Sequence, residues 1–209
     1  CENNPRATRP PIRLRYRAAV TPPATLLPRE GAKTKADLSL IQYDVESIYE
    51  PDFDSFEELI AKLDPNKVNW INIDGLGDIE LLHKLGEHFH LHPLALEDVL
   101  NTAQRPKVER FADHFFIVSE MIYFNEVNQL TFEQVSLFLG DYFLITFQEE
   151  CGHDVFDHVR ERLRAGRGFA RKMKADYLAY ALLDAAVDRI FPVLESVGDS
   201  IESVEEELL

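Results

Sequence analysis

The chain has 209 residues, 45% of them hydrophobic, which is enough for one large domain or two small ones with a substantial core. Its formal net charge of −15 and isoelectric point of about 4.8 disfavour a nucleic-acid partner and favour cations, or simply solubility. Two cysteines, Cys1 and Cys151, make no disulfide framework and fit a reducing cytoplasm. No apolar run approaches the ~20 residues that span a bilayer.

Residues 1–36 differ from the rest of the chain in charge and in proline content. The first 35 residues hold eight Lys or Arg and two Glu, a charge of +6, so the remainder carries −21. They also hold six prolines and little periodic apolar pattern. We therefore predict a flexible or extended basic lead-in, either an irregular solvated tail or a segment that touches anionic lipid.

The next part of the chain alternates between strand and helix patterns. Residues 38–45 and 68–74 have the β-branched, alternating composition of strands. Ser55 is placed to cap a helix over 56–63, and Asp78 to cap one that runs to about Phe89. Pro93 suits the first position of a further helix that ends near Leu100. This order predicts a sheet with helices packed on it.

Three more strand patterns follow, over 114–124, 132–139 and 142–147, with a turn at 125–128 and a hairpin at Gly140-Asp141. A helix is expected from Asp154 over 155–164. A longer helical pattern begins near Lys172 and continues to Leu209, and Pro192 should kink or divide it. We predict an α/β (α+β) domain over 37–170, a mixed sheet flanked by helices, leading into the start of a long stalk helix over 171–209.

Two sets of acidic residues are candidate ligands for a hard cation, which prefers oxygen. Glu97 and Asp98 are adjacent on a short helix without a basic partner at i+4. A second set shares one face of the long helical pattern, opposite its apolar stripe: Asp184, Asp188, Glu195, Asp199, Glu202 and Glu206. For both sets the alternative is an ordinary solvated helix surface.

Histidines give a weaker alternative, a zinc site. His88, His90 and His92 alternate along the chain, so His88 and His92 could share a helix face, although Pro93 makes a regular helix there doubtful. The other interpretation is that these are surface histidines, with His92 at the start of a helix, and Cys151 with His153 could add soft ligands. Motifs for phosphate loops, serine nucleophiles and zinc proteases are absent from the sequence, so we do not expect an enzyme.

Several sequence blocks follow one another in a fixed order: His92-Pro-Leu-Ala-Leu-Glu-Asp-Val-Leu, Gln104-Arg-Pro-Lys-Val-Glu, Gln134-Val-Ser-Leu, Phe147-Gln-Glu, and residues 155–163 and 174–188. In this order they resemble the cytoplasmic domain of CorA-type magnesium and cobalt transporters, over residues 38–209. The Gly-Met-Asn signature of that family is not in the chain and would lie beyond Leu209.

The resemblance implies a regulatory domain on the cytoplasmic side of a cell (inner) membrane protein. It implies a homopentamer, two membrane helices beyond this chain, and transport of Mg²⁺ or Co²⁺. Asp98 would form a regulatory metal site with an acid from the neighbouring stalk, and Mg²⁺ bound there would favour the closed pore. Glu97 and Asp184 would lie near a second, weaker site. The remaining alternatives are a zinc-efflux member of the family and a metal-dependent enzyme.

Overall fold

The computed structural model of the chain describes residues 24–26, 35–102, 104–124, 129–149, 155–166 and 168–207. Most of the predicted basic lead-in lies outside these ranges. So do Cys1, Cys151, Asp154, His153 and the predicted turn at 125–128. The side chain of Glu206 is also outside the description.

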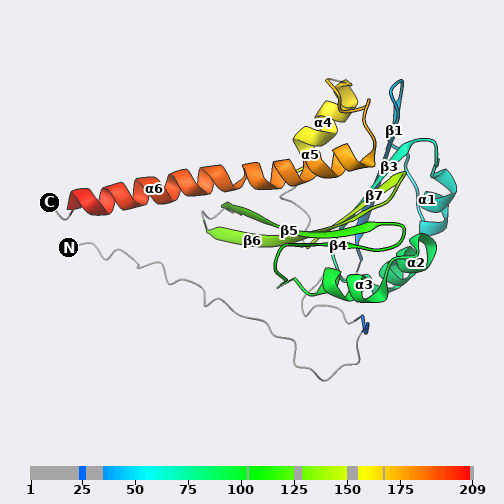
Figure 1. The fold of residues 1–209 in the computed structure, drawn as a ribbon, viewed down its shortest axis with the longest axis horizontal. Helices are drawn as coiled ribbons and strands as arrows, with labels where there is room; N and C mark the ends of the chain where they lie inside the picture. The colour runs from blue at the N-terminus through cyan, green and yellow to red at the C-terminus, as the bar shows by residue number, and fades with distance from the viewer. Residues whose placement is uncertain are drawn as a thin grey trace.

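Seven strands form one mixed sheet in the order β2-β1-β3-β7-β6-β5-β4 (Figure 1). Only β3 and β7 pair in parallel; the other neighbours are antiparallel. The strands are β1 Asp37–Tyr43, β2 Ile48–Tyr49, β3 Val68–Asp74, β4 Lys107–Arg110, β5 Phe115–Phe124, β6 Leu130–Leu139 and β7 Phe143–Gln148. The predicted mixed sheet is confirmed.

Helices cover both faces of this sheet, because its strands are apolar on both sides (Figure 1). Three helices pack on one face: α1 Phe56–Lys62, α2 Ile79–Phe89 and α3 Pro93–Leu100. Two pack on the other: α4 Asp157–Ala165 and α5 Ala175–Asp188. Within β3, Ile71 and Ile73 belong to the first core and Trp70 to the second, as the two-residue period of a strand requires.

The predicted helix starts are confirmed by their capping contacts. The Ser55 hydroxyl accepts a hydrogen bond from the backbone N–H of Glu58 at 3.2 Å, and the Asp78 carboxylate accepts one from Leu81 at 3.0 Å. Pro93 occupies the first turn of α3, where its missing N–H costs nothing. These local signals fix where α1, α2 and α3 begin.

Several boundaries differ from the prediction. β2 and β4 were not predicted, because two and four residues are too short to show a pattern of their own. The first strand ends at Tyr43, before the predicted position 45, and α4 begins at Asp157. The tight connection between β6 and β7 is shifted by one residue: the Gly140 N–H donates to the Phe143 carbonyl at 3.0 Å, so Asp141 and Tyr142 form the loop.

The last helical stretch is divided in two, as Pro192 predicts. α5 ends at Asp188, and α6 Ile190–Glu207 follows after Arg189, with Pro192 in its first turn. α6 runs out beyond the β5–β6 hairpin (Figure 1), and its contacts with the body include those to β5. None of the helices in the described ranges has the length and apolarity to cross a membrane.

Candidate metal-binding site

Asp98 is a partly buried acid at the C-terminal end of α3, with 23% of its side chain exposed. One carboxylate oxygen accepts a hydrogen bond from Lys107 Nζ at 2.6 Å, and the other accepts one from the side-chain amide of Gln104. Both partners come from the chain just after α3, and Lys107 begins β4. Both carboxylate oxygens are thus oriented by neighbours within this chain.

Lys107 bridges two acids. Its Nζ is also 2.9 Å from Glu109 Oε1 and 5.6 Å from the centre of the Phe116 ring. Burial alone would lower the pKa of Lys107, but the hydrogen bonds to Asp98 and Glu109 outweigh it and raise the pKa. The ammonium therefore stays charged at neutral pH and compensates the charge of Asp98.

The end of α3 is also tied to the sheet through its backbone. The side-chain amide of Gln134, buried on β6, donates to the Asp98 carbonyl at 3.1 Å and to Ser136 Oγ at 3.2 Å. The same carbonyl accepts a hydrogen bond from the Asn101 N–H at 3.2 Å where the helix ends, so Gln134 adds a second donor that comes from the sheet. This contact fixes the position of Asp98 relative to the sheet.

Glu97 contacts the N-terminal part of the chain. Its Oε2 accepts a hydrogen bond from the backbone N–H of Ala24 at 2.6 Å. Ala24 has a left-handed backbone (φ 64°), and Leu26 packs partly buried against the core that α3 shares. The described residues 24–26 therefore lie against α3 at the acid next to Asp98.

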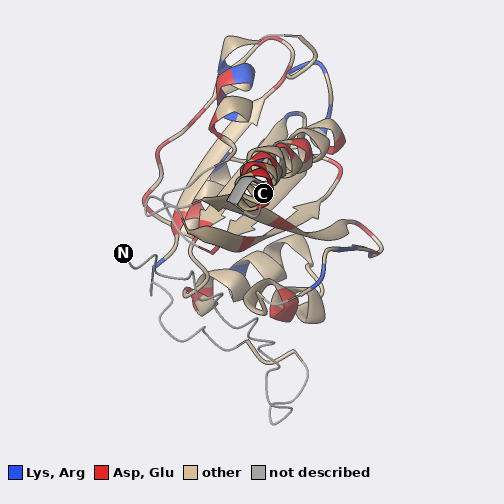
Figure 2. Cartoon of the chain, turned by 90° about the vertical axis from the view of Figure 1, so that its left-hand side faces the viewer, with Lys and Arg blue, Asp and Glu red and all other residues tan. Residues whose placement is uncertain are grey.

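The acids of α5 and α6 are on the protein surface. Asp184 is exposed, with its carboxylate 3.5 Å from the Tyr180 hydroxyl, and Asp188, Glu195 and Asp199 are exposed as well. Figure 2 shows acidic residues along α6, seen here nearly end-on. Because α3 and α5 cover opposite faces of the sheet, Glu97 and Asp184 of one chain lie on opposite sides of it.

The three histidines of the zinc alternative have different structural roles. His88 packs edge-on against Phe89, with ring centres 4.8 Å apart. His90 ends α2 in a left-handed conformation, and His92 caps α3 by accepting from the Leu94 N–H at 3.2 Å. Across the described ranges, no three or more His, Cys, Asp or Glu side chains form a group that could hold a metal ion.

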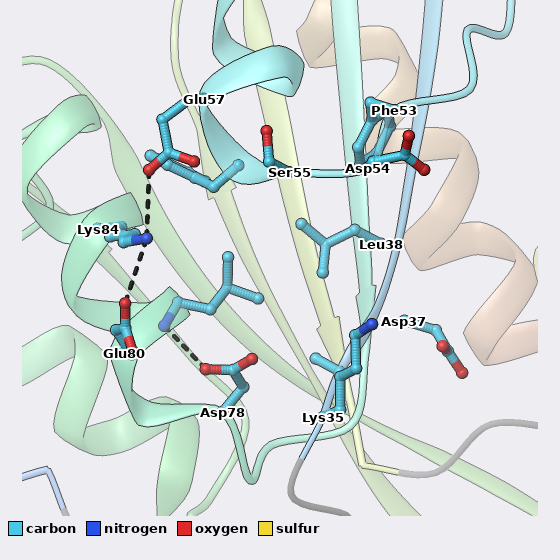
Figure 3. Close-up of a pocket in the computed structure, with 13 residues that line it drawn as sticks. Lys35, Asp37, Leu38, Phe53, Asp54, Ser55, Glu57, Asp78, Glu80 and Lys84 are labelled. Atoms are coloured by element: carbon cyan, nitrogen blue, oxygen red, sulfur yellow. Dashed lines mark hydrogen bonds and ion pairs between the residues drawn. The ribbon is translucent and has the colours of Figure 1, made fainter.

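A second acidic region lines a pocket of about 400 Å³ between β1 and the starts of α1 and α2 (Figure 3). Lys84 reaches into it and lies 3.2 Å from both Glu57 and Glu80. Asp78 also lines the pocket, and its carboxylate is used as the cap of α2. These acids thus have partners within the fold.

Lys107, Glu109 and Gln104 also belong to this site, although they were not predicted from the sequence. The basic partner of Asp98 does not lie one helical turn away but nine residues on, in a strand. The available signal was the i, i+2 spacing of Lys107 and Glu109, which puts both side chains on one face of β4.

The carboxylates of Asp98 and Glu109 offer the oxygen ligands that suit Mg²⁺, a cation that commonly keeps several of its bound waters. A divalent cation that bound Asp98 directly would compete with Lys107 for the negative charge of this carboxylate.

A family model described as CorA-like Mg²⁺ transporter protein matches residues 65–209. The cobalt/magnesium transport protein CorA of Thermotoga maritima is 42% identical over 189 residues, which is 90% of this chain and 54% of that protein. The chain thus spans about half the length of this relative.

Two solved structures share the fold. The soluble domain of CorA from Methanocaldococcus jannaschii matches with a TM-score of 0.59 and 19% identity, covering 81% of this chain and 64% of that one. The ZntB cytoplasmic domain from Vibrio parahaemolyticus matches with a TM-score of 0.61 and 13% identity, covering 79% and 64%. At these identities the likeness concerns the fold alone.

Proposed function

This chain belongs to the family of CorA-like Mg²⁺ transporter proteins, and we propose that it is the cytoplasmic, cation-sensing part of a Mg²⁺ and Co²⁺ channel. The division into a sensing body over residues 37–170 and the start of a stalk over 171–209 is part of this proposal. So are the homopentameric assembly and the membrane helices, which would belong to the rest of the protein in the cell membrane. The family members matched here are named as transporters, which accords with a role other than catalysis.

The position of Asp98 carries the proposal. Its carboxylate is partly exposed at the end of α3, and hydrogen bonds orient both of its oxygens. The described ranges hold no group of three or more potential ligands, and in this proposal Asp98 supplies one half of a site. An acid from the stalk of a neighbouring subunit would supply the other half, with Mg²⁺ and its bound waters between them.

The stalk has the properties that such an assembly needs. α6 exposes large apolar side chains, including Phe191, Leu194 and Ile201, at more than half of their surface. It also carries exposed acids. Burial of the apolar side chains against neighbouring subunits would favour assembly, while the acids would repel one another unless a cation lay between them.

The mechanism follows from that balance of forces. When Mg²⁺ is abundant it binds between subunits at Asp98, screens the repulsion and stabilises the closed pore. When Mg²⁺ falls, the acids repel, the sensing bodies separate and the pore opens. The cation shifts the population toward the arrangement that it binds more tightly. Glu97 and Asp184, from different subunits, would contribute a second and weaker site.

Mg²⁺ inhibition of Mg²⁺ flux in the complete protein, reconstituted in liposomes, tests this function. Asp98→Asn keeps the shape of the side chain and removes its charge, so it should raise the Mg²⁺ concentration needed for closure by on the order of tenfold. Asp52→Asn, at an exposed acid away from α3, is the matched control and should leave inhibition unchanged. Unchanged inhibition in Asp98→Asn would refute the assignment.

Zinc transport is the alternative within the family. It predicts Zn²⁺ binding that survives excess Mg²⁺ and disappears when His88 and His90 are replaced by glutamine. The contacts of these residues account for them as parts of the fold, since His88 packs on Phe89 and His90 ends α2. Calorimetric titration of the chain with Zn²⁺ in excess Mg²⁺ separates the two functions.

A further inference from the structure

Lys107 supplies the positive charge that lies against Asp98 in this structure. Its ammonium lies 2.6 Å from Asp98 and 2.9 Å from Glu109, so one positive charge is shared by two carboxylates. Only 26% of the Lys107 side chain is exposed, and the Phe116 ring lies beneath the ammonium. These contacts keep the charge beside Asp98 and exclude part of the solvent.

We propose that Lys107 is an internal counter-ion of the cation site, which holds Asp98 when no divalent cation is bound and passes to Glu109 when one binds. This inference rests on the proposed function of Asp98. It adds that Lys107 competes with the divalent cation for Asp98, and that Glu109 accepts the Lys107 ammonium when the cation binds.

The exchange requires only a small movement of the Lys107 side chain. Lysine ends in a compact charge on a flexible stem, and its three N–H donors can be redirected by rotation. Because Nζ already contacts Glu109, the ammonium can release Asp98 without losing all of its hydrogen bonds. Glu109 and Lys107 are on the same face of β4, so the strand itself does not have to move.

The exchange has a consequence for the affinity of the site. A divalent cation must overcome the attraction between Lys107 and Asp98 before it binds, so Lys107 raises the Mg²⁺ concentration at which the site fills. Glu109 has the opposite effect, because it stabilises the displaced ammonium. The two neighbouring residues thereby set the threshold of the sensor in opposite directions.

Mg²⁺ titration of the complete protein, in which a neighbouring subunit would supply the other half of the site, tests the proposal when it is followed by NMR at the side-chain amide of Gln104. That amide donates to the Asp98 carboxylate and so reports on this site alone among the acids. Lys107→Met, which retains the apolar stem over Phe116, should lower the Mg²⁺ dissociation constant by on the order of tenfold. Lys107→Gln, which loses the charge but can still hydrogen-bond, should shift it in the same direction.

Lys84→Met is the matched control. Lys84 also bridges two acids, Glu57 and Glu80, but in the pocket beside β1 (Figure 3). The dissociation constant read at Gln104 should stay unchanged in this variant. An equal gain in Lys84→Met and Lys107→Met would mean that only the overall charge matters, and would overturn the proposal.

Glu109→Gln tests the second half of the exchange. It should weaken Mg²⁺ binding severalfold in the natural chain and have no effect in the Lys107→Met background. An equal loss in both backgrounds would make Glu109 a direct ligand and refute the exchange. If Asp98→Asn abolishes the Gln104 shift but Lys107→Met does not tighten binding, this inference alone fails. If Asp98→Asn leaves the shift intact, the proposed function fails with it.

Discussion

The body of the domain and helix α6 differ in how far their apolar side chains are buried. In the body, large side chains such as Trp70, Phe138 and Ile71 are fully buried between the sheet and its helices. In α6, Phe191 and Leu194 are each 59% exposed and Ile201 is 55% exposed. The body therefore gains its stability from contacts within the chain, whereas the apolar side of α6 is covered only in small part by the described residues.

The acids show the same contrast. Asp98 in the body is held by Lys107 and Gln104, so its geometry is set before any ligand arrives. Asp188, Glu195 and Asp199 are exposed on the last two helices. Under the proposed function, the body would supply a carboxylate of fixed geometry to a shared site, and the last two helices would supply charges whose placement depends on assembly.

The largest predicted effect is a loss of stability when the core of the body is truncated. Ile71→Ala removes a fully buried side chain from the core that the sheet shares with α1, α2 and α3, and should cost about 2–5 kcal/mol of unfolding free energy. Ile201→Ala, the same change on α6, should alter the free energy of unfolding by no more than about 0.5 kcal/mol. Urea unfolding of both variants measures the contrast. Equal losses would show that α6 belongs to the core.

Two consecutive buried hydrogen bonds in the body give the next largest predicted loss of stability. Trp70 Nε1 donates to Thr146 Oγ1 at 3.0 Å, and that hydroxyl donates to Asn72 Oδ1 at 2.5 Å. Thr146→Val keeps the volume but leaves both partners unsatisfied, so we expect a loss of about 2 kcal/mol. Fluorescence of the single tryptophan follows both unfolding and the changed environment of the indole. A variant as stable as the natural chain would refute a structural role for this network.

The smallest effect concerns pH. His114 is buried in the body, and burial lowers the pKa of its imidazole below the ordinary 6.5. The charge of Asp113 acts in the opposite direction, and His92 adds to the lowering. The unfolded chain thus binds this proton more tightly, so the contribution of His114 is present above about pH 6.5 and is lost as the pH falls below it.

Stability measured between pH 5 and 7.5 should therefore decline toward acid, and His114→Leu should flatten part of that slope. The cleft that His114 lines also holds four charged residues: Arg110, Asp141, Lys174 and Asp176. The pH dependence of stability is therefore compared between the natural chain and His114→Leu. An identical slope in His114→Leu would assign the decline to other groups.

Local signals made much of the fold predictable from the sequence. Ser55, Asp78 and Pro93 fix helix starts through contacts with the next few residues, and Pro192 divides the last helical stretch. The hairpin was misplaced by one residue because its register depends on packing. An added Cβ at Gly140 would come within 2.3 Å of the Phe143 ring, a contact that no sequence pattern reveals.

The candidate site was predictable only in part. Asp98 could be singled out from its neighbours and from the family resemblance, but Lys107 lies in a four-residue strand that exists because β5 pairs with it. The contact between Glu97 and Ala24 joins residues 73 positions apart. Such partners are set by tertiary structure, and a single sequence does not encode them as a local pattern.

The Mg²⁺ concentration that half-inhibits flux through the complete protein, compared between Asp98→Asn and Lys107→Met, tests the central claim most directly. The two substitutions remove opposite charges from one ion pair. If Asp98 is the sensing carboxylate and Lys107 its competitor, Asp98→Asn should raise this concentration and Lys107→Met should lower it. Shifts in the same direction, or no shift in Asp98→Asn, would contradict the account.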